Sequence, residues 1–91
     1  MSIQWLFDVI EDRKQNPSAK SYTSSLLAEG LPKIAQKVGE EGTEVVVAAL
    51  AQDDQRLIEE VADLTYHTLV LLAARGLTPA HVLAELEKRH R

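Results

Sequence analysis

Acidic side chains gather at two places in the sequence, each with the spacing of one helix face. The first group contains Glu40, Glu41 and Glu44, with Lys37 one turn earlier. At about 100° per residue, these four positions share one sector of about 100° on a helix. A second acidic group lies further along the chain and occupies a narrower sector: Glu60, Asp63 and His67. Two helices are therefore expected, each with an acidic cluster on one side.

Like charges this close repel one another, so a compensating cation is expected. Carboxylate oxygens are the ligands that Mg²⁺ prefers, and Mg²⁺ keeps several of its waters when it binds. We predict a magnesium site, which Mn²⁺ could also occupy, with the ligands Glu41, Glu44, Glu60 and Asp63. Di-iron bundles use Glu-x-x-His pairs, and neither acidic pair has this form. His67 is expected to be a hydrogen-bonded neighbour of the site and not a ligand.

The same acids could instead be solvated helix faces, as most charged stretches are. Two features favour a site. Both acidic groups border strongly apolar stretches, so their shared sector could lie at the edge of a core. Gly39 and Gly42 also weaken the helix beside the acids, and close approach of a ligand would be a reason to tolerate them.

A metal held by carboxylates can orient a phosphate-rich substrate and activate water for attack on phosphorus. The negative charge of such a substrate also needs cations. Lys33 and Lys37 lie one turn apart on the first acidic helix, and Lys14 and Lys20 flank the loop over residues 15–21. Each lysine taken alone could equally be an ordinary solvated residue.

Hydrophobic spacing predicts an all-α fold of five helices, two of them long and antiparallel. Ser2, Asp53 and Thr78 are placed as N-caps, and Gly30 and Gly76 as C-terminal glycines. The expected helices are residues 2–14, about 22–29, Pro32 to about Ala51, the Asp53-Asp54 cap to Gly76, and Thr78-Pro79 onward. In the last helix, the apolar side chains are expected to face inward: Val82, Leu83 and Leu86.

One segment of the third helix is ambiguous. Val45-Val46-Val47 favours a strand locally, and Gly39 and Gly42 each cost a helix about 1 kcal/mol relative to alanine. We still predict a helix, because no turn signal interrupts the segment and no second β segment could pair with it. The run from Val45 to Leu50 is apolar around its whole circumference, which a chain of 91 residues could hardly cover. A homodimer is therefore expected.

Composition argues against several classes of protein. The 91 residues suit one domain, residues 1–91, and no apolar run approaches the ~20 residues of a membrane span. A net charge of −4 argues against a binder of duplex nucleic acid, and the lack of cysteine excludes a disulfide scaffold. The N-terminus shows no basic leader, so we expect a cytoplasmic protein with neither nucleic-acid nor membrane partners.

The acidic motif resembles that of a known group of enzymes. The segment Lys37-Val-Gly-Glu-Glu-Gly-Thr-Glu44, followed by Glu60-Val-Ala-Asp63, resembles the EExxE…ExxD signature of MazG-type all-α nucleoside triphosphate pyrophosphohydrolases. The wider context is more specific: Ser21-Tyr22-Thr23, Leu26-Leu27, Gly30, Lys33-Ile34 and Ala62-Asp63-Leu64-Thr65-Tyr66-His67. From Trp5 onward the chain is similar to the phosphoribosyl-ATP pyrophosphohydrolase family.

The resemblance implies hydrolysis of 1-(5-phosphoribosyl)-ATP to 1-(5-phosphoribosyl)-AMP and pyrophosphate by a cytoplasmic α-helical dimer. This reaction is the second step of histidine biosynthesis and uses Mg²⁺, and water would attack the α-phosphorus. Position by position, the metal-binding acids of the family match Glu41, Glu44, Glu60 and Asp63. The only departure that we find is Gly42, where alanine is common in the family.

The remaining roles also follow from the resemblance. Glu40 matches the first acid of the motif and is a candidate to orient or deprotonate the attacking water, a role for which Glu44 competes. Lys33 and Lys37 would contact phosphates. The residues expected to line the substrate pocket are Ser21, Tyr22 and Thr23.

Two other functions stay open on the sequence alone. One is a housekeeping enzyme of the same fold that hydrolyses ordinary or damaged nucleotides. The other is a non-catalytic helical dimerisation module whose acids are merely solvated.

Overall fold

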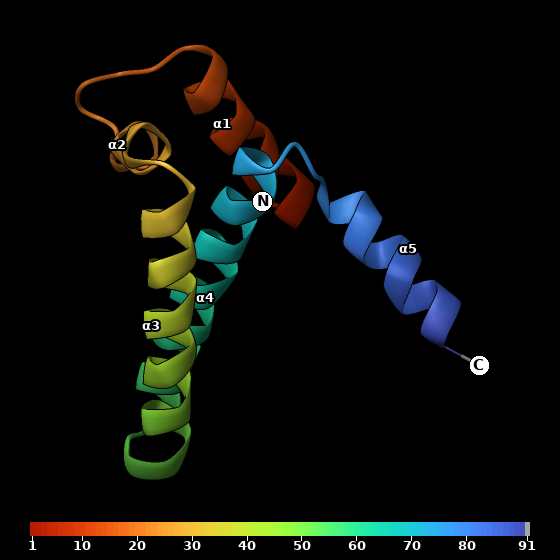
Figure 1. The fold of residues 1–91 in the computed structure, drawn as a ribbon. Coiled ribbons are helices and arrows are strands. Elements are labelled where there is room, and N and C mark those ends of the chain that lie inside the picture. Colours follow the sequence, from red (N-terminus) through yellow and green to blue (C-terminus); the bar gives the residue numbers. More distant parts are fainter. Residues whose placement is uncertain (91) are drawn as a thin grey trace.

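The computed structural model describes residues 1–90, and Arg91 lies outside the described residues. Within these residues the chain forms five α-helices. Figure 1 shows how they are arranged. Their bounds are Ile3–Gln15 for α1, Tyr22–Glu29 for α2, Leu31–Ala51 for α3, Asp54–Ala74 for α4 and Pro79–Arg89 for α5. Within residues 1–90 there is no strand, so the all-α prediction is confirmed, and the bounds agree with the predicted ones to within a couple of residues.

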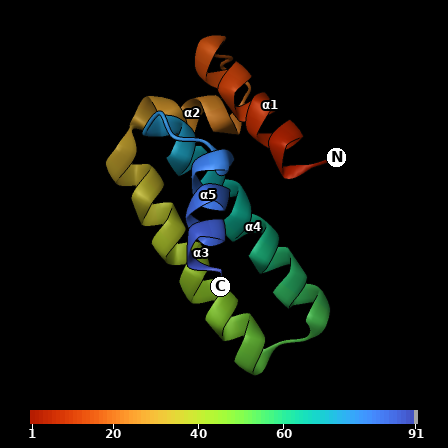
Figure 2. The same cartoon turned by 90° about the vertical axis from the view of Figure 1, so that its right-hand side faces the viewer.

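The two long helices form an antiparallel pair. α3 and α4 lie side by side and are joined by a tight connection at Gln52 and Asp53 (Figures 1 and 2). α3 runs without a break through the ambiguous valines, so the helical prediction is confirmed there. The side chain of Asp53 accepts a hydrogen bond from the backbone N–H of Arg56 at 2.9 Å and caps α4 as expected.

Local signals set most of the other helix ends. The Ser2 hydroxyl accepts a hydrogen bond from the N–H of Trp5 at 3.0 Å at the start of α1. Gly30 separates α2 from α3 with a φ of 93°, and Gly76 follows α4 with a φ of 71°. Both angles lie in the left-handed region, where glycine avoids the steric cost that other residues meet.

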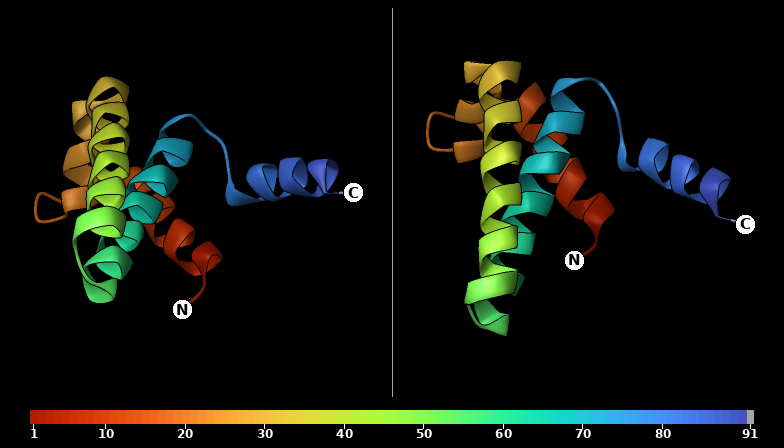
Figure 3. Two further views of the ribbon diagram at one scale, coloured as in Figure 1. Left: turned by 90° about the horizontal axis from the view of Figure 1, so that it is seen from below. Right: turned by 60° about the horizontal axis from the view of Figure 1, so that its bottom comes forward.

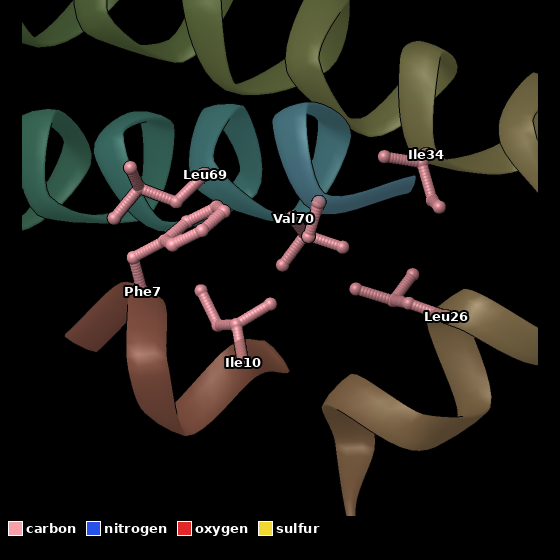
Figure 4. Packing of buried hydrophobic residues seen from close by; sticks show 7 residues of the cluster. Phe7, Ile10, Leu26, Ile34, Leu69 and Val70 are labelled. Atoms are coloured by element: carbon pink, nitrogen blue, oxygen red, sulfur yellow. The ribbon is translucent and has the colours of Figure 1, made fainter. Parts of the chain in front are cut away.

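The apolar core lies at one end of the α3–α4 pair. Side chains from α1, α2, the beginning of α3 and the end of α4 meet there, as Figure 4 shows. Its buried members are Phe7, Ile10, Leu26, Ile34, Leu69, Val70 and Ala73. Lys14 adds a polar contact at this end, because its Nζ donates to the backbone carbonyl of Ala73 at 2.8 Å. Lys14 therefore caps the C-terminus of α4.

Helix α5 turns away from the rest of the molecule. It is bent by 106° from α4 and projects outward in Figures 1 and 3. Val82, Leu83 and Leu86 are 44%, 58% and 57% exposed, so the prediction that they face inward is wrong for the single chain. The positive φ of Gly76 belongs to the turn that redirects the chain, and α5 has no buried residue.

Within residues 1–90 no single helix has both the length and the apolar character needed to cross a membrane. Only α4 and α5 taken together, a pair bent by 106°, reach the length and apolar composition of a membrane span.

Candidate metal centre

Three carboxylates from the two long helices come together between α3 and α4. Glu41 on α3 and Glu60 and Asp63 on α4 each offer a ligand oxygen, and these oxygens lie within 4.8 Å of one another. Opposite ligands of a magnesium ion at ~2.1 Å would be about 4.2 Å apart, so small side-chain adjustments would suit one ion. Glu41 and Glu60 are only 6% and 4% exposed, whereas Asp63 is exposed.

The two buried glutamates each have an oxygen without a protein partner. Within residues 1–90, neither Glu41 Oε2 nor Glu60 Oε2 has a hydrogen-bond partner. An unsatisfied buried polar atom costs about 1–3 kcal/mol, and more when it belongs to a charged group. Oxygen ligands of this kind fit a hard divalent cation such as Mg²⁺ or Mn²⁺. These orphaned oxygens make solvated acids a poor description of the cluster.

The other oxygen of each buried glutamate is held by a cation from the preceding turn. Lys37 Nζ lies 3.5 Å from Glu41 Oε1, and Arg56 Nη2 donates to Glu60 Oε1 at 2.6 Å. Both pairs have the same spacing of four residues, one on α3 and one on α4. Arg56 also pairs with Glu59. Sequence reasoning missed Arg56, although its spacing to Glu60 repeats that of Lys37 to Glu41.

The charge on Lys37 is favoured by its surroundings. Burial acts to lower the pKa of its ammonium group, but the neighbouring Tyr22, Glu40 and Glu41 outweigh this effect and raise the pKa. Lys37 is therefore cationic at neutral pH and partly neutralises the acids. Lys33 is half-buried one turn earlier and acts electrostatically on Glu40.

Glu44, the fourth predicted ligand, is exposed and lies beside the three converging carboxylates without being one of them, whereas Glu40 is held elsewhere. The side chain of Glu44 interacts with Glu60 and Glu41, and these contacts raise the pKa of its carboxyl from 4.5 to about 7. Glu40 is exposed and accepts a hydrogen bond from Gln36 at 2.7 Å. That bond, with the charge of Lys37, lowers the pKa of Glu40. The 100° rotation between Glu40 and Glu41 thus places only Glu41 between the helices.

His67 links the acids to α2. It is buried, and its Nδ1 donates to the backbone carbonyl of Asp63 at 2.8 Å. The Tyr22 hydroxyl lies 3.1 Å from Nε2, within hydrogen-bond distance. His67 is therefore a hydrogen-bonded neighbour of the acids, as the sequence predicted.

The three residues expected to line a substrate pocket have different surroundings. The Ser21 hydroxyl caps α2 by accepting from the N–H of Ser24 at 3.1 Å. The Thr23 hydroxyl bonds to that of Tyr66, a residue that sequence reasoning did not single out. Tyr22 is 53% exposed, and its ring stacks on that of Tyr66 with centroids 6.3 Å apart. Burial raises the pKa of the Tyr66 hydroxyl.

The two glycines beside the acids have free space around them. A Cβ atom added at Gly39 or Gly42 would meet no atom of this chain within 4 Å, apart from the backbone of the helix itself. Packing within the chain therefore does not require glycine at either position.

Comparison with known sequences gives a consistent result. A sequence model of the phosphoribosyl-ATP pyrophosphohydrolase family matches residues 4–90. A phosphoribosyl-ATP pyrophosphatase of Lacticaseibacillus casei is 54% identical over 88 residues, covering 97% of this chain and 80% of the relative. One from Pyrobaculum calidifontis is 51% identical over 87 residues, covering 96% of this chain and 93% of the relative.

Crowding of the carboxylates predicts a pH dependence for the metal-free protein. The pKa of the Glu44 carboxyl is about 7 in the folded protein, whereas its ordinary value is 4.5. Between these pH values the carboxyl is protonated in the folded state and ionised in the unfolded state. The free energy of unfolding should therefore fall as pH rises through this window. Glutamine does not titrate, so the free energy of unfolding of Glu44→Gln should not fall in this way. Relative to the wild type, the variant should therefore become more stable as pH rises from 5 to 7.

Urea denaturation in metal-free buffer at several pH values measures this difference. Glu87→Gln, which changes an exposed glutamate on α5, serves as the matched control and should follow the wild-type profile. Parallel pH profiles for the wild type and Glu44→Gln would contradict the prediction.

Proposed function

The chain belongs to the phosphoribosyl-ATP pyrophosphohydrolase family, and from this we infer that it hydrolyses 1-(5-phosphoribosyl)-ATP to 1-(5-phosphoribosyl)-AMP and pyrophosphate. This reaction is the second step of histidine biosynthesis. The substrate is a derivative of ATP, so we also propose that the enzyme acts in the cytoplasm, where ATP-dependent biosynthesis takes place.

The observation that carries the mechanism is the pair of orphaned glutamate oxygens between α3 and α4. We propose that Glu41, Glu60 and Asp63 hold a divalent cation, with Glu44 completing the set. When bound, Mg²⁺ would neutralise phosphate charge and polarise the phosphorus that is attacked. The donor set contains only oxygens, which favours Mg²⁺ or Mn²⁺ over softer metals.

The side chains around the acids would then position the substrate and the attacking water. Water attacks the α-phosphorus and gives up a proton to a carboxylate of the site, and pyrophosphate leaves with the electron pair of the broken P–O bond. We propose that Glu44 orients this water, because it reaches the cluster while Glu40 is occupied by Gln36 and Lys37. Lys33 and Lys37 would offset charge on the phosphates. Tyr22 and Thr23 would border the substrate from α2.

Substrate comparison tests the function directly. We expect kcat/KM for phosphoribosyl-ATP to exceed that for dCTP, dUTP or ATP by about 100-fold or more. The phosphoribosyl group that is added to ATP in this substrate offers polar contacts that plain nucleotides lack. Steady-state release of pyrophosphate measures all four substrates. A preference for a plain nucleotide would instead indicate a housekeeping enzyme of the same fold.

Removal of a ligand carboxylate tests the metal site. Loss of a residue that only supports a metal ligand lowers metal affinity or activity about 10–100-fold. Loss of a ligand should have a larger effect, so Glu60→Gln and Asp63→Asn should each reduce kcat by more than ~100-fold. The metal-free variants should be as stable as the wild type or slightly more stable, because repulsion among the acids is reduced. Steady-state release of pyrophosphate measures kcat, Mn²⁺ titration calorimetry checks that metal binding is lost, and thermal denaturation measures stability. Unfolded variants would mean that the acids are structural.

We further propose that the protein is a homodimer. Large apolar side chains remain exposed on α3 and α5, among them Val46, Val47, Leu50, Leu83 and Leu86. A chain of this size buries only about 60–65% of the surface of its unfolded form. α5 has an apolar face and no buried residue. A second copy of the chain could cover this face, and most soluble oligomers are homo-oligomers.

A charge on the apolar face of α5 tests the dimer. Leu83→Glu should weaken self-association by at least about 100-fold, because burying an unpaired carboxylate costs several kcal/mol. Sedimentation equilibrium measures the dissociation constant. Lys88→Gln makes the same change in net charge at another exposed position of α5 and should leave association unchanged. Equal association of the wild type and Leu83→Glu would exclude this face from the interface.

A further inference from the structure

The two ends of the acidic cluster offer different surroundings. Towards the connection between α3 and α4 lies a pocket of about 260 Å³, lined by Glu44, Val47, Gln52, Arg56 and Glu60. Towards α2 lie Lys37 and the stacked rings of Tyr22 and Tyr66. Arg56 marks the pocket end of α4, and His67 marks the end near Tyr22. These two positions are roughly 16 Å apart along the helix, at about 1.5 Å per residue, and Glu60 and Asp63 lie between them.

The size of the pocket limits what it can hold. Pockets for drug-sized molecules occupy about 300–1,000 Å³, so this one suits a small group better than a nucleoside. Glu60 is 4% exposed, lines the pocket and carries the unpartnered Oε2, so the pocket is continuous with the metal centre.

The charges in the pocket point to a phosphate group that arrives with a metal. Its one cationic lining residue among residues 1–90 is Arg56, beside the carboxylates of Glu44 and Glu60. These acids would repel an anion unless a divalent cation were present. The guanidinium of Arg56 has five donors, and its contacts with Glu59 and Glu60 leave several of them for phosphate oxygens.

The opposite end suits the nucleoside half. The Tyr22 ring is 53% exposed and stacked on Tyr66 at an interplanar angle of 27°. An exposed aromatic face can stack on a base. Tyr22 is also among the neighbours that raise the pKa of Lys37, so this end of the site keeps a cation.

We propose that the substrate lies along the α3–α4 pair in one direction, with its pyrophosphate half in the Arg56 pocket and its phosphoribosyl-AMP half towards Tyr22. This orientation rests on the proposed function and adds to it the residue that binds the leaving group. Arg56 is then a binding residue for pyrophosphate, beyond its ion pair with Glu60.

Product binding in Mg²⁺ tests the orientation, with pyrophosphate and AMP as the two probes in titration calorimetry. Arg56→Gln should weaken pyrophosphate binding about tenfold or more, the effect of losing one hydrogen bond to a charged group, and change AMP binding less than about twofold. Tyr22→Ala should show the opposite pattern. Arg56→Lys should recover part of the pyrophosphate affinity because it keeps the charge.

Two controls separate a direct contact from an indirect one. Arg75→Gln removes an equal charge from the C-terminal end of α4 and should bind both probes as the wild type does. Mn²⁺ alone should bind Arg56→Gln at least as tightly as the wild type, because a repelling cation has been removed. Parallel losses of Mn²⁺ and pyrophosphate affinity would mean that Arg56 acts only through Glu60, and would overturn the proposal.

The remaining outcomes are also distinct. Unchanged pyrophosphate binding by Arg56→Gln, or weakened AMP binding in its place, would overturn the orientation while leaving the proposed function intact. If the wild type neither hydrolyses phosphoribosyl-ATP nor binds pyrophosphate in Mg²⁺, the proposed function fails, and the orientation fails with it.

Discussion

The constraint on which this structure depends is the burial of two carboxylates, Glu41 and Glu60, between α3 and α4. Each would be expensive to keep ionised in a protein interior without compensation. Lys37 and Arg56 supply part of that compensation, and each occupies a single oxygen of its glutamate. The free oxygens then face the space between the helices, where a divalent cation can complete their coordination.

The fold keeps this unfavourable arrangement away from the apolar core. α1 and α2 pack against the beginning of α3 and the end of α4, and the buried apolar side chains are concentrated there. The rest of the α3–α4 pair is left without a covering helix, as Figure 2 shows for its connecting end. Hydrophobic burial at one end can thus hold the two helices in register while the acids lie further along the pair, outside the apolar core.

The sequence predicted what local interactions decide, and it failed where distant contacts decide. Caps such as Ser2 and Asp53, and the helix through Val45–Val47, depend on neighbouring residues and on the lack of a pairing strand. The separation of Glu40 from Glu41 depends on which side of α3 meets α4, which a single-helix projection cannot tell. The direction of α5 depends on the turn at Gly76, whose geometry the hydrophobic spacing does not give. Arg56 was missed because its role depends on the burial of Glu60, which the sequence does not show.

The balance of charge explains why a metal and a polyphosphate should bind together. The four acids Glu41, Glu44, Glu60 and Asp63, when ionised, exceed the two cations Lys37 and Arg56 by two negative charges. One divalent cation removes that excess, and only then can an anion approach without net repulsion. A third basic residue would offset half of this excess without the metal and weaken the binding of the metal. The incomplete compensation is therefore the reason that the proposed site would depend on a divalent cation.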